Sequence, residues 1–454
     1  MNLPPGNTPH RVAVAVAARD GKIRRRATEI FAAAARDWNQ APAVIARMFR
    51  GARELRSAER RFVGEAVYGM IRWRRRLGFA IGSEHASALA MYLVWLAGEF
   101  KGDGPDGKPA TKIDAQVETE LRVAGIDPAR VANVETRLAA IGDDDERIAI
   151  AQSYPTWLVQ RLTAERGRDD AEKLLAAMNR RAPLTARANR LKNTRDELIA
   201  ILADDGIEAE PSPLAPDGVE LRTHVNAYGL RAFQDGRFEL QDAGSQAIAE
   251  LTAPPPRGVV VDACAGAGGK TLALGALLGN RGRLTAFDPS EPKLEELRTR
   301  ARRAGLTNVR ALVVDEKLPI DEELALIGRA DRVLCDVPCS GLGTLRRNPE
   351  ARWRLQPSDL DELPPLQRAI LERYAPLVAP GGRLVYATCT VDAAENDAVV
   401  DAFAAAHPEF VAVPAKEILG KLRAAEIGDG MRLRMLPSVH DTDGFFAAVL
   451  RRKE

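Results

Sequence analysis

Hydrophobic and polar residues follow two different periods along this chain. From residue 22 to about residue 96, apolar positions recur every three or four residues in a segment rich in Ala, Leu, Arg and Glu. This spacing gathers apolar side chains on one face of an α-helix. Glycines and prolines interrupt the pattern at residues 101–109, and helical spacing resumes over residues 116–138. The pattern predicts an all-α domain over residues 22–147.

The pattern becomes mixed in the next part of the chain. Helical spacing follows Pro155 and recurs over residues 170–179 and 194–202, and an alternating run typical of a strand covers residues 184–191. These changes of period predict a small α+β connector over residues 150–240.

Strands and helices alternate strictly in the last part of the chain. Short apolar runs are each separated by a helical segment, which is the pattern of a parallel sheet covered by helices on both faces. We therefore predict an α/β fold for a third domain over residues 241–454. The runs are residues 259–261, 284–287, 311–314, 332–334 and 384–387.

Composition narrows the classes of protein to consider. The 65 basic and 63 acidic residues give a net charge of +2, so charge by itself does not indicate a partner. The four cysteines lack the spacing of a disulfide framework, which favours a reduced, cytoplasmic protein. The richest apolar stretch, residues 86–97, is shorter than the roughly 20 residues that cross a bilayer, so no membrane role is expected.

A turn of small residues follows the first apolar run of the third domain. Glycines in such a turn let backbone N–H groups approach a small ligand closely. The spacing does not match a phosphate-binding P-loop, because Cys264 stands where that loop needs a glycine, and the dinucleotide fingerprint lacks its third glycine. The turn consists of Cys264, Ala265, Gly266, Ala267, Gly268, Gly269 and Lys270.

Acidic residues stand at the ends of three successive predicted strands. Asp262, Asp288 and Asp315 should meet in one crevice, since the carboxyl ends of parallel strands lie at the same edge of a sheet. Asp288, about 20 residues beyond the turn, is placed to accept hydrogen bonds from two ribose hydroxyls. A single Asp would more simply be a cap or turn residue, but three at matching positions favour a ligand site.

Two thiols and a further acid, Asp336, stand at the same predicted edge. Cys339 and Cys389 follow strands beside polar residues, where partial exposure and backbone dipoles favour the thiolate form. Cys335 lies inside its strand and is interpreted as an inert core residue. A metal site is not favoured, because no second close pair of ligands accompanies Cys335 and Cys339.

This combination suits methylation of a cytosine ring at its fifth carbon. That carbon is a weak nucleophile, and a thiolate that adds to the sixth carbon supplies the electron density it needs. Asp336 is placed to hydrogen-bond the ring nitrogen and the exocyclic amine, where charge develops. A second cysteine in the site can assist release of the enzyme thiol.

The motifs resemble those of the RsmB/Sun family of RNA cytosine-5 methyltransferases. Residues 264–270 are similar to the family's cofactor loop, residues 336–341 to its fourth motif, and residues 388–390 with Glu395-Asn396 to its sixth. Further matches, which extend the resemblance to most of the chain, lie at residues 241–246, 346–349 and 443–446.

The family resemblance implies both a fold and a cofactor. It implies a class I Rossmann-like methyltransferase domain whose mostly parallel, seven-stranded sheet ends in an antiparallel strand near residues 445–450. The implied cofactor is S-adenosylmethionine. One departure is Gly266-Ala267, where the family commonly has Ala-Pro, and this implies a more flexible loop.

The same resemblance implies a role for each candidate residue. Cys389 would be the attacking nucleophile, and Cys339 would help the product leave. Asp336 would sit between the cofactor and the base. Asp288 would hold the cofactor ribose, and Asp315 would lie on the adenine side.

The N-terminal helices are similar to the NusB-like RNA-binding domain of the family's bacterial small-subunit members. The similarity rests on residues 24–30 and 65–72, and it implies RNA, most specifically 16S ribosomal RNA, as the substrate. Phosphate contacts would weaken with salt, and a solvated helix face is the alternative for either cluster. The arginines expected at RNA are Arg24, Arg25, Arg26, Arg72, Arg346 and Arg347.

Two other functions stay open at this point. A non-catalytic RNA-binding or ribosome-assembly factor could keep the fold, although it would have no need of paired thiols at strand ends. A DNA cytosine methyltransferase would be expected to attack with the cysteine of the fourth motif and to carry a target-recognition insert, which is not evident. We expect a monomeric cytoplasmic enzyme that uses no metal.

Overall fold

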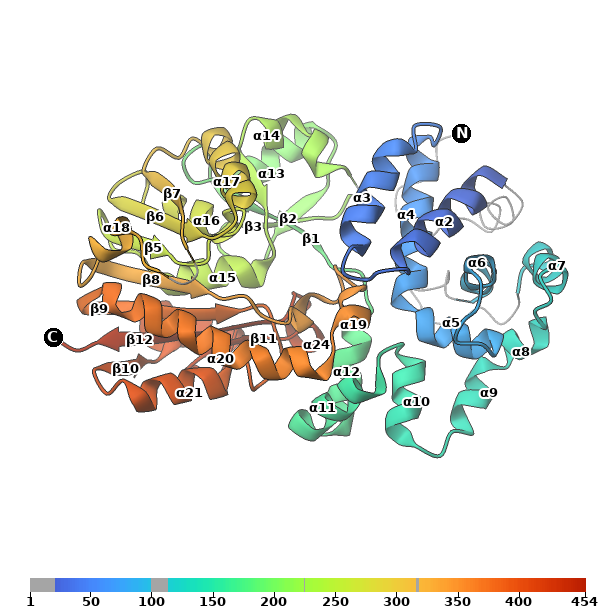
Figure 1. Cartoon of the computed structure of the whole chain (residues 1–454). Coiled ribbons are helices and arrows are strands. Elements are labelled where there is room, and N and C mark those ends of the chain that lie inside the picture. The colour runs from blue at the N-terminus through green and yellow to red at the C-terminus, as the bar shows by residue number, and fades with distance from the viewer. Residues whose placement is uncertain (1–20, 99–112, 224, 316–317) are drawn as a thin grey trace. The chain divides into compact units, whose positions relative to one another are not determined.

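The chain folds into two compact units (Figure 1). The computed structural model describes residues 21–98, 113–223, 225–315 and 318–454. The helical unit comprises Met1–Arg181 with Leu345–Pro357, and the sheet unit comprises Ala182–Thr344 with Ser358–Glu454. Of the three helical segments predicted for the connector, the first two therefore group with the helical unit, and the third groups with the connector's strands in the sheet unit.

The helical unit is built around α6 (Ala88–Ala97), which is apolar on every face. A helix without a polar face is stable in water only when it is buried, and α2, α4, α5 and α7 contact α6 on several sides. Ser87 begins α6 by accepting a hydrogen bond from the Ala90 N–H. The remaining bounds are α2 (Gly21–Ala34), α3 (Ala41–Gly51), α4 (Ser57–Arg72), α5 (Arg74–Ile81), α7 (Ala115–Val123), α8 (Pro128–Ala132), α9 (Val134–Ala139), α10 (Asp144–Ala151), α11 (Thr156–Arg166) and α12 (Arg168–Ala177).

A small antiparallel sheet opens the sheet unit, with strand order β2-β3-β1-β4. The helix α13 (Arg195–Asp204) begins with a capping box, in which Thr194 and Glu197 satisfy each other's backbone N–H groups. The strands are β1 (Leu184–Ala188), β2 (Ala209–Pro211), β3 (Gly218–Leu221) and β4 (Phe238–Leu240), and α14 (Arg231–Gln234) precedes β4.

The large sheet has the order β10-β12-β9-β8-β5-β6-β7, and β11 pairs with β12 outside this path. The neighbours from β9 to β7 are parallel, whereas β10, β11 and β12 are antiparallel to the strands beside them. The strands are β5 (Val259–Asp262), β6 (Arg283–Asp288), β7 (Val309–Val313), β8 (Ala330–Asp336), β9 (Val378–Thr388), β10 (Phe410–Val413), β11 (Leu433–Met435) and β12 (Phe445–Arg452).

The predicted α/β class and the antiparallel last strand are confirmed, with one addition to the strand number. In the described part of the chain, the main path of the sheet has the seven strands predicted, and the short β11 adds an eighth beside β12. Strand order reverses at β5, since β6 and β7 lie on one side of it and β8 and β9 on the other. Such a reversal opens a crevice at the carboxyl ends of β5 and β8, where open α/β sheets bind ligands.

Helices connect the strands of the large sheet (Figure 1). Apolar residues from strands and helices form several buried clusters in this unit. One contains Phe287, Leu371 and Phe403, and another contains Ile248, Leu274 and Val385. The helices are α15 (Ala243–Thr252), α16 (Gly269–Leu277), α17 (Glu291–Ala304), α18 (Asp321–Leu324), α20 (Pro357–Tyr374), α21 (Asp397–Ala406), α22 (Ala415–Leu419), α23 (Lys421–Glu426) and α24 (Pro437–His440).

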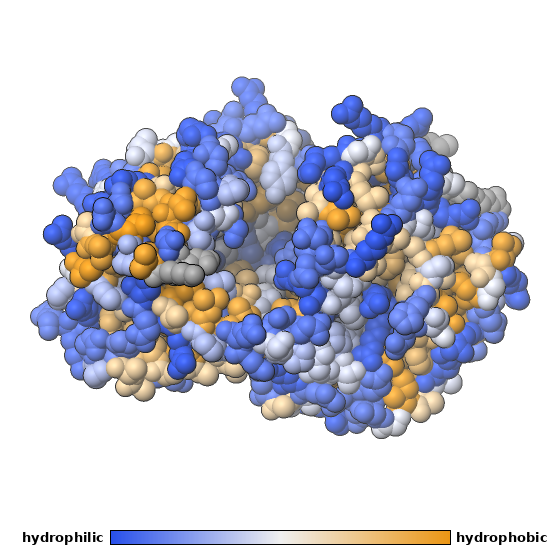
Figure 2. All heavy atoms as spheres, in the orientation of Figure 1, coloured by the Kyte–Doolittle hydropathy of each residue, from blue (hydrophilic) through white to orange (hydrophobic). Residues whose placement is uncertain are grey.

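Hydrophilic residues dominate the face shown in Figure 2, and hydrophobic ones gather in patches. Large apolar side chains are exposed along β7 and around α18, namely Val313, Leu318, Leu324 and Ile327. Among the described residues, no helix combines the length and the apolar character that a membrane span requires.

The helical unit contains a segment that comes from the middle of the sheet unit's sequence. After the turn Leu342–Thr344, the chain enters Leu345–Pro357, which includes α19 (Ala351–Arg354) and belongs to the helical unit. The Trp353 indole N–H donates to the Ile71 carbonyl at 2.7 Å, and Arg352 donates to Asn179 Oδ1 at 2.8 Å. The sequence pattern did not predict this insertion.

Candidate active site

The turn between β5 and α16 is fixed by two aspartates at strand ends. Asp262 is buried and accepts a hydrogen bond from the Thr271 hydroxyl at 2.7 Å. Asp288 is also buried, and one of its carboxylate oxygens accepts the Gly266 N–H at 2.9 Å. Its other oxygen accepts the Ser290 N–H at 2.9 Å. The carboxyl ends of β5 and β6 are thereby joined through the glycine-rich turn.

Two glycines give this turn its shape. Gly266 and Gly268 have φ angles of 53° and 88°, in the left-handed region that side-chain-bearing residues rarely adopt. A Cβ atom on Gly268 would lie 2.6 Å from Leu297 Cγ, so α17 packs tightly there. A Cβ atom on Gly266 would meet nothing within 4 Å. Gly266 therefore borders open space at the ligand crevice.

The buried carboxyl group of Asp262 has a raised pKa and one oxygen atom without a hydrogen-bond donor in the described part of the chain. Burial raises the pKa of its carboxyl to about 7, although the Thr271 hydrogen bond opposes this rise. Its Oδ1 atom is buried and has no hydrogen-bond partner among the described residues. A buried acceptor without a donor is costly, and a ligand cation or donor would satisfy it.

Lys270 and Asp336 form an ion pair in the crevice, with 2.7 Å between Nζ and Oδ2. The Lys270 side chain is 9% exposed and that of Asp336 is 28% exposed. Burial lowers the pKa of Lys270, but the charge of Asp336 and the nearby Cys389 raise it more, so the net shift is upward. Lys270 therefore stays positively charged and lies close to the Cys389 sulfur.

The two candidate thiols lie side by side, with 3.4 Å between Cys339 Sγ and Cys389 Sγ. Both residues are partly exposed. The hydrogen bond with Cys389 and burial raise the pKa of the Cys339 thiol well above its ordinary value. Cys339 is therefore a protonated thiol that can donate to the Cys389 sulfur.

A close approach of two glycines aligns the loop after Cys389. The Gly343 N–H donates to the Cys389 carbonyl at 3.0 Å, and the Gly444 N–H donates to the Gly343 carbonyl at 2.8 Å. A Cβ atom on Gly343 would lie 2.1 Å from the Gly444 oxygen, so no other residue fits without movement. The segment after residues 336–341 is thus held directly against the loop that carries Cys389.

A buried glutamate links the two cysteine loops, and sequence reasoning missed its role. Glu395 is fully buried and accepts hydrogen bonds from the Ser340 N–H and the Gln367 side chain, each at 2.9 Å. It also accepts from the Thr390 hydroxyl at 3.1 Å and from the Ser340 hydroxyl. Glu395 belongs to a motif that the sequence did reveal, but the motif's spacing does not show what the carboxylate contacts.

The other predicted site residues take different positions. Cys335 is fully buried, and burial raises its pKa, as expected of an inert core thiol. Burial also raises the pKa of Cys264 well above its ordinary value. Asp315 is exposed two residues after β7, and its carboxylate accepts the Leu318 N–H at 2.9 Å. Its expected place beside a cofactor stays a prediction.

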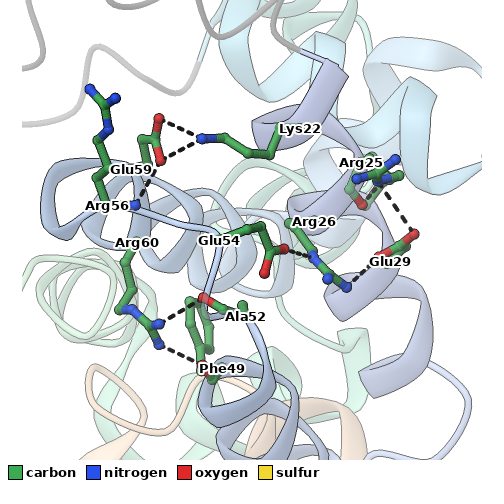
Figure 3. Close-up of polar contacts among 11 residues, drawn as sticks. Lys22, Arg25, Arg26, Glu29, Phe49, Ala52, Glu54, Arg56, Glu59 and Arg60 are labelled. Atoms are coloured by element: carbon green, nitrogen blue, oxygen red, sulfur yellow. Dashed lines mark hydrogen bonds and ion pairs between the residues drawn. The ribbon is translucent and has the colours of Figure 1, made fainter.

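Most of the predicted RNA-contacting arginines bind other parts of the helical unit. Arg24 pairs with Glu120, and Arg26 pairs with Glu29 and Glu54; the pairs of Arg25 and Arg26 are drawn in Figure 3. Arg72 donates to the Arg346 carbonyl at 2.8 Å.

Exposure separates these arginines further. Arg346 is 2% exposed, so its side chain does not face solvent, whereas Arg25 and Arg347 are exposed. An RNA contact by Arg346 would require its segment to rearrange. The RNA contacts of all six arginines remain a prediction.

Comparison with known proteins identifies the family. Residues 249–451 match the model described as 16S rRNA methyltransferase RsmB/F, and residues 154–228 match an RsmF/B-like ferredoxin-like domain. A probable ribosomal RNA small subunit methyltransferase B of Synechocystis sp. is 32% identical over 428 residues, which cover 87% of this chain and 91% of the relative. The chain belongs to the RsmB/F family of methyltransferases.

One further relative agrees with membership of the RsmB/F family, and one solved structure bears on the fold. A probable ribosomal RNA small subunit methyltransferase B of Bacillus subtilis is 38% identical over 316 residues, which are 69% of this chain and 70% of the relative. The crystal structure of NSun6 from Pyrococcus horikoshii with SFG has a TM-score of 0.59 at 21% identity, over 67% of this chain and 100% of that chain. That structure shares the fold, and the resemblance to the RsmB/Sun family is confirmed.

Three features of this RsmB/F chain would suit a cofactor of the S-adenosylmethionine type. The open space at Gly266 admits a ligand against the backbone, and the Asp262 oxygen without a partner can accept from a ligand ammonium. Asp288 retains unused lone pairs for ribose hydroxyls. In the described part of the chain, no group of three His, Cys, Asp or Glu side chains is arranged to hold a metal ion.

Proposed function

We propose that this chain methylates the fifth carbon of a cytosine in 16S ribosomal RNA, with Cys389 as the nucleophile. The observation that carries the proposal is the pair of sulfurs 3.4 Å apart beside the Lys270–Asp336 ion pair. A protein that only binds RNA has no need of two adjacent thiols at a ligand crevice.

In the proposed reaction, Cys389 first forms a bond from its sulfur to the sixth carbon of the cytosine. Electron density moves to the fifth carbon, which can then take up a methyl group. Asp336 accepts a hydrogen bond from the exocyclic amine, and Lys270, which is paired with Asp336, offsets the negative charge that develops on the ring. S-adenosylmethionine supplies the methyl group as an electrophile when it is bound. The fifth carbon then loses its proton, and its electrons reform the ring double bond as Cys389 departs.

Cys339 has a separate role in the last of these steps. Its raised pKa keeps it protonated beside Cys389. A neighbouring thiol can protonate or hydrogen-bond the departing sulfur, which makes that sulfur a better leaving group. Cys339 therefore assists product release and leaves the attack to Cys389.

The relatives support the substrate and the cofactor. The Synechocystis and Bacillus relatives are each named as a probable ribosomal RNA small subunit methyltransferase B. The Pyrococcus NSun6 structure holds SFG, an S-adenosylmethionine analogue, in a shared fold. We also propose that the helical domain over residues 22–147 contacts RNA, for which Arg25 is an exposed candidate. Arg347, in the segment Leu345–Pro357, is the other exposed candidate.

The test is transfer of labelled methyl from S-adenosylmethionine to 16S ribosomal RNA, transfer RNA and duplex DNA in parallel, with nucleoside analysis. We expect 5-methylcytosine in the ribosomal RNA alone. Cys389→Ala should abolish transfer while cofactor binding persists, and Cys335→Ala is the matched control, because that thiol is buried away from the reaction. Cys339→Ala should accumulate a covalent protein–RNA adduct on denaturing gels.

Three results would contradict parts of this proposal. Full turnover by Cys389→Ala would refute the assignment of Cys389 as the nucleophile. Label found only in DNA would refute the assignment of RNA as the substrate. Cofactor binding without transfer to any nucleic acid, including small-subunit assembly particles, would instead favour a non-catalytic RNA-binding or assembly factor.

A further inference from the structure

We propose that Glu395 is the positioning residue that sets the distance between Cys339 and Cys389. This inference rests on the proposed function, in which Cys389 attacks the base and Cys339 assists product release. It concerns a side chain that touches neither base nor cofactor and acts through the residues that follow each cysteine in sequence.

The first part of the argument is that Glu395 contacts both cysteine loops. Ser340 follows Cys339, and its N–H and its hydroxyl both donate to the Glu395 carboxylate. Thr390 follows Cys389, and its hydroxyl donates to the same carboxylate at 3.1 Å. The Ser340 and Thr390 hydroxyl oxygens are themselves only 2.8 Å apart. One carboxylate therefore joins the two loops directly after their thiols.

The second part is that Glu395 is itself held rigidly. Gln367 on α20 donates to the Glu395 carboxylate at 2.9 Å and to the Pro338 carbonyl at 3.1 Å, on the other side of Cys339. The Tyr386 hydroxyl donates to the Glu395 carbonyl and contacts Gln367 Oε1 at 3.1 Å. Glu395 is therefore fixed through its carboxylate by α20 and the loops, and through its backbone carbonyl by β9.

The third part is that Asn396 forms hydrogen bonds with the residues on either side of Cys389. The Thr388 hydroxyl donates to Asn396 Oδ1 at 2.6 Å, and Asn396 Nδ2 donates to the Thr390 carbonyl at 3.1 Å. The residues before and after Cys389 are thus both tied to the Glu395-Asn396 pair. Little freedom remains for the Cys389 backbone.

The contacts at this position favour a carboxylate over an amide. Two N–H groups point at one oxygen and two hydroxyl groups at the other, so the site offers donors on every side. A carboxylate accepts all of them. An amide can keep its oxygen for the two N–H groups, but its NH₂ group can only donate, so both hydroxyl groups would have to reorient and accept. Burial raises the pKa of Glu395, and the hydrogen bonds from Ser340 and Gln367 oppose that rise.

The experiment compares Glu395→Gln with Glu323→Gln in the full-length protein. Glu323 is another buried glutamate of the sheet unit, paired with Arg373 at 2.8 Å, and it has no contact with the cysteine loops. The distance between the sulfurs is measured by the rate at which diamide, which takes up the two electrons and two protons, joins Cys339 and Cys389 in a disulfide. Peptide mass mapping identifies that disulfide without any need for RNA.

We expect Glu395→Gln to slow this cross-link by about tenfold, because disulfide formation requires a narrow range of geometry. Methyl transfer should fall by about 10²-fold in kcat, as misplacement of about 1 Å does in other enzymes, with unchanged affinity for S-adenosylmethionine. Glu323→Gln should cross-link and turn over as the wild type does.

A second pair of variants covers the case in which Glu395→Gln fails to fold. Thr390→Val keeps the shape of the side chain but loses the hydroxyl that meets Glu395, whereas Thr390→Ser keeps it. We expect Val to slow the cross-link and Ser to restore the wild-type rate. A role in stability alone would not distinguish the two hydroxyl states in this way.

The outcomes separate this inference from the proposed function. Wild-type cross-linking rates in Glu395→Gln and Thr390→Val would overturn the positioning role, even if turnover fell. Slow cross-linking in both variants supports the positioning role, even if the wild-type protein methylates no RNA and the proposed function fails.

Discussion

Residues 336–344 are held by a carboxylate in the sheet unit, whereas residues 345–357 are held by a guanidinium in the helical unit. Glu395 meets a donor at every contact that its two oxygens make. Arg352 is also fully buried, but its Nη1 atom alone reaches oxygen acceptors, on Asn179 and two backbone carbonyls. Its Nε and Nη2 atoms have no hydrogen-bond partner among the described residues.

The difference shows two ways of holding a segment: Glu395 aligns the atoms of two loops, whereas Arg352 anchors a segment without fixing its exact position. A carboxylate with complete hydrogen bonding can occupy only one position, so it suits loops whose atoms must meet. Arg352 instead lies flat on Tyr154, with 3.9 Å from its guanidinium carbon to the ring centroid. Stacking and volume hold it, and they tolerate small shifts. Burial lowers the pKa of Arg352, in keeping with this incomplete set of partners.

The largest expected effect breaks the anchor. Arg352→Ala should destabilise the helical unit by about 3–5 kcal/mol, because it removes one of the two donors to Asn179 Oδ1 and opens a cavity on Tyr154. Tryptophan fluorescence during urea unfolding measures this specifically, since all five tryptophans of the chain belong to the helical unit. Arg354→Ala, an exposed change in the same helix, should stay within about 0.5 kcal/mol. Equal midpoints for the two variants would show that Arg352 anchors nothing.

The next prediction compares Glu395 with another buried carboxyl group of the sheet unit, Asp262, which lacks a full set of hydrogen-bond donors among the residues that the structure describes. Asp262 has a pKa of about 7 in the folded chain, above its ordinary value of about 4. The folded state therefore binds a proton that the unfolded state has released, and stability should fall as pH rises from about 4 to about 7. Asp262→Asn should flatten this dependence, by up to about 4 kcal/mol at about 1.4 kcal/mol per pKa unit.

Thermal unfolding of wild type and Asp262→Asn across this pH range provides the measurement. Asp321→Asn, at an exposed position in the same unit, serves as the control and should keep the wild-type slope. If Asp262→Asn also kept that slope, the Asp262 carboxyl would have to be ionised in the folded protein and stabilised by hydrogen-bond donors or a positive charge.

The smallest effect probes how complete the Glu395 network is. Tyr386→Phe removes a hydroxyl that contacts Gln367 and the Glu395 carbonyl, and it should cost about 1 kcal/mol. Circular dichroism during urea unfolding measures the loss, and the tryptophan signal of the helical unit should not move. Tyr374→Phe is the matched control, because Tyr374 stacks on Phe287 through its ring. A larger loss for Tyr374→Phe would mean that the network adds little rigidity.

Much of the sheet could be predicted because buried parallel strands are continuous apolar runs. The runs at residues 259–261 and 284–287 fall inside β5 and β6, and the turn between them had the glycines that its backbone needs. Asp315 shows the limit of the method. The strand ends at Val313, and a pattern of apolar residues does not tell where pairing stops or which way the next carboxylate turns.

The candidate thiols could be found from sequence, but the groups that align them could not. Cys339 and Cys389 stand at strand ends, which meet at one edge of a sheet. Glu395 lies in a loop before α21, and its contacts depend on how that loop folds back. Arg352 was missed for another reason, since charged residues are usually solvated and nothing in its sequence neighbourhood signals the ring of Tyr154.

The segment Leu345–Pro357 also affects the order in which the protein can be completed on the ribosome. Synthesis releases α2 to α12 first, and N-terminal domains commonly fold as they emerge. Here the place beside Tyr154 and Asn179 stays unfilled until Arg352 has been made, after β1 to β8 of the sheet unit. The part of the chain that is translated first is therefore finished late, and a nascent chain halted before residue 345 would expose an unfinished helical core.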